Sequence, residues 1–131
     1  MSNNITRMQT LEQRRAAAAL GSIDSVVGKN YDSKYRSLVR SFPAYVLTNG
    51  LAPALAFLKS KGDPEHEELY RQLSDWVPKE LGLSSGELLD VILQQNSYAY
   101  MRTTQEALAF VVWLKRFAEA KIQGKQAEEQ V

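Results

Sequence analysis

The sequence predicts an all-α fold: a single-domain bundle of about six helices around a central helix near the C-terminal end. Apolar residues recur at spacings of three and four in one segment after another, as on one face of an α-helix. No alternating pattern typical of a β-strand extends beyond a few residues. With 131 residues and 44% hydrophobic side chains, the chain suits one compact helical domain, 1–131. We expect residues 1–4 and 124–131 to be frayed.

The first predicted helix runs from about Ile5 to Val27. Its apolar residues repeat at helical spacing, and the alanines at 16–19 would let a neighbouring helix approach closely. The segment 28–30, Gly-Lys-Asn, follows the last apolar residue and is typical of a C-cap.

A second helix begins at Asp32 or Ser33 and contains Pro43. Proline removes a backbone N–H and clashes with the preceding turn. We therefore expect either a kink or a stop with a new start at 44–47. Gly50, which adopts the left-handed conformation easily, ends this segment.

Two further helices have clear start signals. Pro53 suits the first turn of a helix that ends at Gly62. Asp63, followed by a proline and a glutamate, is an N-cap candidate for the next helix, which ends at Pro78 or at Leu81-Gly82.

A short helix through 88–93 is predicted to begin at Ser84, because Glu87 lies three residues further on, at the spacing of a capping box. The central helix follows within the segment Tyr98 to Phe117. There Thr103 or Thr104 is the N-cap candidate, with Glu106 at capping-box spacing, so the helix is predicted to start near Thr103. Its apolar residues cover more than one face, so we expect several neighbours to pack on it.

The chain shows no recognisable catalytic motif. It has no cysteine, which excludes disulfides, thiolate metal sites and cysteine nucleophiles. Neither a GxGxxG nor a Walker sequence occurs, and no serine or threonine lies in a recognisable nucleophile motif. We therefore expect no enzyme activity, no cofactor and no small-molecule substrate. No apolar run approaches the roughly 20 residues of a membrane span, and no signal peptide is recognisable, so we expect a cytoplasmic protein without membrane contact.

The only histidine, His66, lies among the acidic residues Asp63, Glu65, Glu67 and Glu68. A catalytic zinc site usually needs two or three histidines at fixed helical offsets, and no HExxH-like pattern is present. Acidic residues are typical of the first turn of a helix, where they stabilise the positive end of the helix dipole. We interpret the cluster as a helix N-terminus and predict no metal site.

The net charge of +1 conceals an uneven distribution. Residues 1–61 hold nine Lys/Arg and three Asp/Glu (9 − 3 = +6), residues 62–101 hold two and eight (2 − 8 = −6), and the remaining residues hold five and four (5 − 4 = +1). Such asymmetry favours a basic surface for phosphate and an acidic one for another partner or another copy of the chain. Folding that mixes the charges again is an equally good interpretation.

Basic residues close to aromatic ones are the candidates for nucleic-acid binding. Phosphate contacts, with an occasional stacked ring from Tyr35, Tyr98 or Tyr100, would give sequence-independent binding to a single strand. Core packing is the alternative for each tyrosine, and a plain solvated surface is the alternative for the arginines. The candidate nucleic-acid-binding residues are Arg14, Arg15, Arg36, Arg40, Arg102, Lys115 and Arg116.

Two separated strings carry a family resemblance. They are NGLxxALAFLxxK at 49–61 and YMRxTxEALxxxxWLKRF at 100–117. In this order and at this length, the chain from about Arg14 to Ala120 resembles the small helical subunit of the Cmr complex, the type III-B CRISPR RNA-guided effector. Arg102, Lys115 and Arg116 lie within the second string, whereas the other four candidates are chosen for charge and expected exposure.

The resemblance implies a non-catalytic subunit that stacks beside the backbone subunits carrying the guide RNA and helps to hold target RNA in antiviral defence. Its partners would be other Cmr subunits, further copies of itself, and guide or target RNA. The acidic region of one copy could meet a basic region of the next, for example Glu67 with Arg36. A free-standing helical adaptor for single-stranded RNA and a pure protein scaffold are the alternatives.

Overall fold

The structure, a computed structural model, describes residues 9–124. Within this range it contains six α-helices and no strand, which confirms the predicted fold class. In chain order the helices are α2 (Leu11–Asp24), α3 (Asp32–Asn49), α4 (Leu51–Lys61), α5 (Pro64–Leu81), α6 (Leu88–Leu93) and α7 (Ser97–Lys121). Residues 1–4 and 125–131 of the predicted frayed ends lie outside the described range, and Gly124 follows α7 outside any helix.

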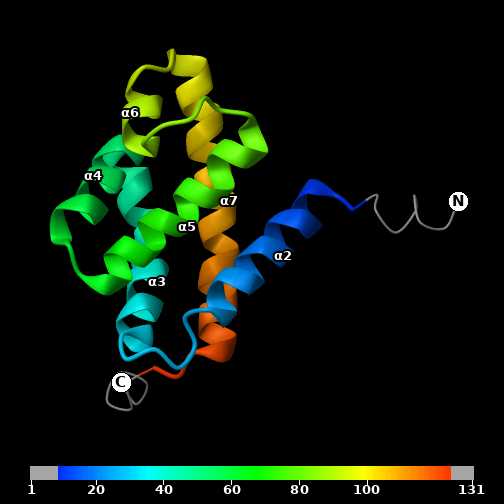
Figure 1. Cartoon of the computed structure of the whole chain (residues 1–131), viewed down its shortest axis with the longest axis vertical. Helices are drawn as coiled ribbons and strands as arrows, with labels where there is room; N and C mark the ends of the chain where they lie inside the picture. The colour runs from blue at the N-terminus through cyan, green and yellow to red at the C-terminus, as the bar shows by residue number, and fades with distance from the viewer. Residues whose placement is uncertain (1–8, 125–131) are drawn as a thin grey trace, which may run out of the picture.

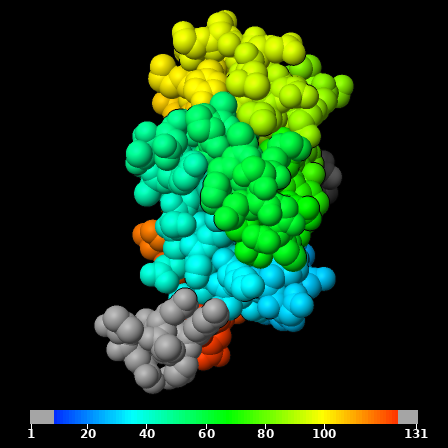
Figure 2. Space-filling view, turned by 90° about the vertical axis from the view of Figure 1, so that its left-hand side faces the viewer, coloured from blue at the N-terminus to red at the C-terminus, as the bar shows by residue number. Residues whose placement is uncertain are grey.

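Helix α7 is the central element. Its 25 residues extend about 37 Å at 1.5 Å per residue, and Figure 1 shows it along the long axis of the molecule. Helices α2, α3 and α5 all pack against it, which confirms the prediction of several neighbours. Helices α3, α4 and α5 cover the face seen in Figure 2. The residues that α7 buries are Thr103, Glu106, Ala107, Phe110, Val111, Leu114 and Ala118.

The predicted start of α7 near Thr103 is wrong, because the helix begins at Ser97. Asn96 is the N-cap, and its side-chain oxygen accepts a hydrogen bond from the backbone N–H of Ala99 at 2.8 Å. The hydroxyls of Thr103 and Thr104 instead donate to the carbonyl oxygens four residues earlier, both at 2.9 Å. A threonine hydroxyl can also donate to the carbonyl four residues earlier inside a helix, so residue type alone does not locate the helix start.

Helix α2 begins later and ends earlier than the predicted first helix, whose residues 5–8 lie outside the described range. A capping box at Thr10 and Gln13 starts it at Leu11: the Thr10 hydroxyl accepts from the Gln13 N–H at 3.0 Å, and the Gln13 side chain accepts from the Thr10 N–H at 2.9 Å. The helix ends at Asp24 with Ser25 as its C-cap, before the predicted C-cap at 28–30. Val26 stays fully buried in the turn that follows, so the apolar pattern extends beyond the helix itself.

Proline does not interrupt the helices as expected. Helix α3 runs through Pro43 to Asn49, so a stop with a new start at 44–47 is wrong. Phe42 and Val46 are buried on either side of Pro43, and their packing offsets the loss of one backbone hydrogen bond. Helix α5 likewise continues through Pro78 and ends at Leu81, where Gly82 adopts the left-handed conformation with φ +65°.

The capping box predicted at Ser84 is also wrong. Helix α6 begins at Leu88, and Glu87 is its N-cap without a side-chain cap bond. The Glu87 carboxylate instead accepts hydrogen bonds from Lys59 of α4 and Tyr70 of α5, both at 2.8 Å. These long-range partners replace the local cap that the spacing predicted.

Gly50 forms the corner between α3 and α4, as predicted. It has φ +95° and ψ 161°, and its N–H donates to the Val46 carbonyl at 2.7 Å. A β-carbon at this position would lie 3.5 Å from the Tyr100 hydroxyl, which itself accepts a hydrogen bond from the Ala52 N–H at 2.9 Å. The corner is therefore fastened to the first turns of α7.

Replacing Gly50 with alanine should lower the free energy of unfolding by about 1–3 kcal/mol, because this backbone region is accessible essentially to glycine alone. Gly21→Ala is the matched control. Gly21 lies within α2 with no atom within 4 Å of an added β-carbon, so alanine should stabilise the protein by about 0.5–1 kcal/mol. Urea denaturation followed by circular dichroism measures both changes. Equal stability of the two variants would contradict this account.

Candidate nucleic-acid interface

Four of the seven candidate cations gather where α3 passes the C-terminal half of α7. We call Arg36, Arg40, Lys115 and Arg116 the α3–α7 basic cluster. Glu119 lies among them, 3.7 Å from Arg40 and 3.5 Å from Arg116. Four cations and one carboxylate give the group a formal charge of +3.

Three of the four cations line two surface hollows that share Glu119 as a lining residue. One is lined by Arg40, Lys115 and Glu119 together with the serines at 37 and 41 of α3. The second is lined by Arg36, Glu119 and residues 120–123 at the end of α7. Because Glu119 borders both hollows, they lie next to each other on the surface formed by α3 and α7.

Two cations of this surface remain well exposed. The side chains of Arg40 and Arg116 are 51% and 65% exposed, and Lys115 is half-buried. Exposed ion pairs such as those with Glu119 contribute only about 0–1 kcal/mol. The cations can therefore exchange Glu119 for another anion at little cost.

Arg15 lies apart from the two hollows of the cluster and is largely buried between α2 and α7, although it lines another hollow together with Arg116. Its guanidinium donates two hydrogen bonds, at 2.7 and 2.8 Å, to the two carboxylate oxygens of Glu106, and the side chain is 14% exposed. The Trp76 indole N–H of α5 donates to the same carboxylate at 2.8 Å. This geometry fastens α2 and α5 to α7 and leaves Arg15 little capacity for phosphate.

Electrostatics support this structural role. The hydrogen bond to Glu106 raises the pKa of Arg15. Burial by itself raises the pKa of Glu106, but the hydrogen bonds from Arg15 and Trp76 outweigh it, so the pKa of this carboxyl lies below its ordinary value. Both groups are therefore charged at neutral pH.

The two remaining candidates also lie apart from the cluster. Arg14 pairs with Glu80 of α5 at 2.7 Å and is about half exposed. Arg102 is exposed near the start of α7, 13 residues and thus about 20 Å along the helix from Lys115. It lies one helical turn from Tyr98, which is 68% exposed.

The tyrosines separate in the same way. Tyr98 is open for stacking, whereas Tyr35 is fully buried and donates to the side-chain oxygen of Gln72. Burial raises the pKa of Tyr35 well above its ordinary value, so its hydroxyl stays protonated. The core alternative is therefore correct for Tyr35.

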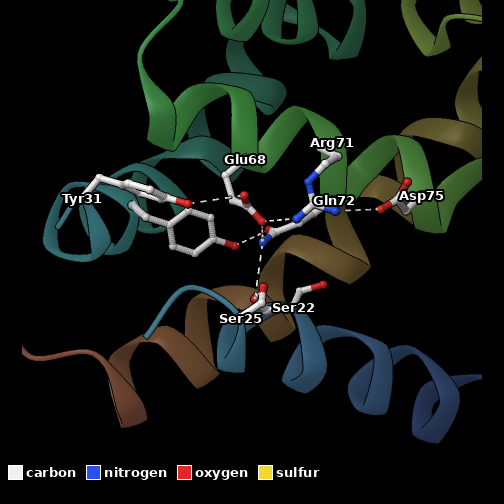
Figure 3. A network of polar contacts seen from close by, with 8 residues as sticks. Ser22, Ser25, Tyr31, Glu68, Arg71, Gln72 and Asp75 are labelled. Atoms are coloured by element: carbon white, nitrogen blue, oxygen red, sulfur yellow. Dashed lines mark hydrogen bonds and ion pairs between the residues drawn. The ribbon is translucent and has the colours of Figure 1, made fainter. Parts of the chain in front are cut away.

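Tyr35 belongs to a polar network that joins α2, α3 and α5 (Figure 3). The Gln72 amide donates to Glu68 at 3.0 Å and to the Ser22 carbonyl at 3.5 Å. Arg71 pairs with Glu68 and, at 3.0 Å, with Asp75. The network neutralises part of the acidic middle segment within the fold itself.

Ion pairs between helices bring parts of the basic segment 1–61 next to parts of the acidic segment 62–101. Arg14–Glu80 and Lys59–Glu87 each join the basic first segment to the acidic middle. Glu67 is exposed and has no ion pair within the described part of the chain. Folding thus mixes the charges in part while leaving the α3–α7 basic cluster as a cationic surface.

The sequence analysis missed Trp113 as a surface residue. Trp113 lines a hollow between α2 and α7 with Arg15, Arg116 and Val112, and stacks on Phe117 with ring centroids 5.5 Å apart. A half-buried ring beside an exposed arginine can stack on a nucleobase. The arginine that follows it closely in sequence was a usable signal, but the apolar character of the helix masked it.

No helix within residues 9–124 combines the length and hydropathy required to span a membrane. The fold and the α3–α7 basic cluster define a small helical protein with a cationic surface patch.

Comparisons with known proteins narrow this class to one family. The family model described as CRISPR-associated protein (Cas_Cmr5) matches residues 11–121, so the chain belongs to the Cmr5 family of CRISPR-associated proteins. The CRISPR system Cmr subunit Cmr5 of Thermus thermophilus is 32% identical over 117 residues, which cover 88% of this chain and 99% of that protein. Its namesake from Thermotoga maritima is 26% identical over 124 residues, covering 95% and 94%.

A solved structure agrees with these relatives. The crystal structure of a CRISPR-associated Cmr5 family protein from Thermus thermophilus superposes with a TM-score of 0.77, at 32% identity, over 88% of this chain and 100% of that one. The family resemblance carried by the two strings is thereby confirmed.

Glu106→Gln should change the acid stability of the protein. The pKa of Glu106 in the folded protein lies below its value of about 4.3 in the unfolded chain. The contribution of its charge to the free energy of unfolding is therefore fully present above about pH 4.3 and is lost as the pH falls through the folded-state pKa. At pH 7 the free energy of unfolding of the variant should be about 1–3 kcal/mol lower than that of wild type, because Arg15 is left without its charged partner. The difference in free energy of unfolding between the variant and wild type should become smaller below about pH 4.

Urea denaturation at a series of pH values from 7 to 3 measures this stability difference as a function of pH. The control is Glu80→Gln, which removes the more exposed pair with Arg14 and should cost at most about 1 kcal/mol. Stability curves of wild type and Glu106→Gln that stay parallel down to pH 3 would refute the assigned role.

Proposed function

We propose that this chain is the non-catalytic small subunit of a Cmr complex, a type III-B CRISPR RNA-guided effector acting in the cytoplasm. It stacks along the filament of backbone subunits and helps to hold target RNA in antiviral defence. Family membership supports the complex, since two relatives are named as Cmr subunits. The observation that supports the RNA-holding role is the α3–α7 basic cluster, in which four cations gather on one surface and two of them lie close to Glu119.

The cluster contacts phosphates and reads no bases. Arg40 and Lys115 reach the RNA backbone from α3 and α7, and each phosphate they neutralise releases condensed counterions. Sequence specificity comes from pairing between guide and target, so the subunit needs no base-edge contacts. With a formal charge of only +3, the cluster binds weakly by itself and acts when neighbouring subunits hold it beside the RNA.

Other parts of the surface face protein neighbours. Tyr98 and Met101 of α7 and Leu93 of α6 are 68%, 55% and 64% exposed around the start of α7. Exposed apolar side chains close together in sequence favour contact with another subunit, including a second copy. The exposed Glu67 of one copy then approaches a basic residue of the next, with Arg36 as the named pairing.

Purification of the tagged protein from its own cells under gentle conditions tests the proposal directly. A large particle containing short RNAs with a shared repeat-derived end is the expected result. A small RNA-free species that stays small at physiological salt would overturn the subunit assignment and favour a free-standing adaptor or scaffold.

Removing two cluster cations should weaken target-RNA binding without changing its sequence preference. In a reconstituted complex, Arg40→Ala combined with Lys115→Ala should reduce the slope of log affinity against log salt by about 1 for each lost phosphate contact. The matched control is Lys79→Ala, an exposed lysine in the last turn of α5. Filter binding at several salt concentrations gives the slopes. A double variant with the wild-type slope would remove both residues from the RNA surface.

A further inference from the structure

We propose that Asp63, Glu65 and His66 bind a divalent transition-metal ion of the zinc type at the corner between α4 and α5. The site lies outside the α3–α7 basic cluster and is independent of the proposed RNA-holding role. One potential ligand atom from each residue lies within 4.8 Å of the others. The sequence analysis dismissed this cluster on spacing, but the three-dimensional arrangement adds evidence that spacing does not contain.

The decisive observation is the state of His66. This residue is 8% exposed, and its Nδ1 atom is buried without a hydrogen-bond partner. Buried polar atoms are almost always satisfied, and an exception points to an absent water molecule or ion. Here Nδ1 faces the carboxylates of Glu65 at 3.4 Å and Asp63 at 3.6 Å.

These separations fit a metal better than direct hydrogen bonds. Zinc binds histidine nitrogen and carboxylate oxygen at about 2.0–2.2 Å, and two ligands of a tetrahedral ion with such bonds lie about 3.4 Å apart. A direct N–H···O bond would be about 2.9 Å long. An ion between the three atoms would satisfy the Nδ1 lone pair and both carboxylates together.

The two carboxylates also lack other partners. Asp63 is the N-cap of α5, yet its side chain makes no cap hydrogen bond. Glu65 is 7% exposed, and within the described part of the chain its only polar contact is with His66. Burial of a carboxylate is costly unless the charge is compensated. A bound cation supplies that compensation.

The positive end of the α5 helix dipole repels a cation, but this repulsion is weaker than the attraction of the two carboxylates. The N-terminus of α5 carries about half a positive charge, whereas the two carboxylates carry two negative charges. Imidazole is a ligand that zinc, copper, iron and nickel prefer, whereas magnesium and calcium prefer oxygen alone. The mixed donor set therefore selects a transition metal.

Packing holds the imidazole in place. The Phe57 ring of α4 meets the His66 ring edge to face, with centroids 5.4 Å apart, and stacks on Tyr45 of α3 at 4.9 Å. The Asp63 side chain is 54% exposed, which leaves room for water as a fourth ligand. Metal binding would thus connect the α4–α5 corner with the aromatic packing onto α3.

Zinc titration of the full-length, untagged and chelator-treated chain tests the site. Because His66 is the only histidine, its ring NMR signals report on this position alone. Zinc at concentrations well above Kd should shift the His66 ring signals with one-to-one stoichiometry and raise Tm by about 3–8 °C. Magnesium at the same concentrations should do neither.

Matched variants separate a site from adventitious binding. Asp63→Asn, at an exposed side chain whose loss should leave the fold intact, and His66→Gln should both abolish the zinc-dependent rise in Tm. Glu67→Gln, an exposed acid of the same helical turn, should keep it. Unchanged wild-type Tm and ring signals would overturn the proposal. An equal rise in Tm for all variants would also overturn it. Neither outcome bears on RNA binding, which the titration does not involve.

Discussion

The carboxylate of Glu106 is the contact on which the arrangement of three helices depends. It lies on α7 at 6% exposure and accepts hydrogen bonds from Arg15 of α2 and Trp76 of α5. Removing the charge of Glu106 leaves Arg15 without its charged partner, which costs about 1–3 kcal/mol. Trp76 also stacks on Phe110 with centroids 5.5 Å apart, so the polar contact continues directly into the apolar core. Because α7 carries Lys115 and Arg116, this contact also fixes half of the basic cluster.

The parts of the fold that depend on local chemistry were predictable. The glycines at 50, 62 and 82 end helices where expected, since each has a positive φ that other residues adopt only with strain.

The capping boxes predicted at Ser84 and Thr103 fail for a common reason. In each, the acid three residues later has a partner far away in sequence: Glu87 binds Lys59 and Tyr70, and Glu106 binds Arg15 and Trp76. Spacing shows that a carboxylate is available but not which partner it takes.

The candidate site shows the same limit. Arg15 and Arg40 look alike in sequence, yet Arg15 forms a largely buried ion pair with Glu106, whereas Arg40 stays on the surface. Separating them requires knowing which helix faces which, and that is a tertiary property. The two strings that carried the family resemblance are more informative than either alone, because they meet in space. The Tyr100 hydroxyl of the second string accepts the N–H of Ala52 in the first.

Glu119 gives the basic cluster a property beyond its charge. Because this carboxylate lies near both Arg40 and Arg116, the cations already have an anionic neighbour before any phosphate arrives. Under the proposed RNA-holding role, an incoming phosphate would replace Glu119 instead of meeting a bare charge, and after a phosphate departs the cations would pair with Glu119 again. Such exchange lowers the net gain on binding and shortens the lifetime of each contact. In the proposed role, such a surface would favour turnover, in which one RNA strand is released and the next is bound.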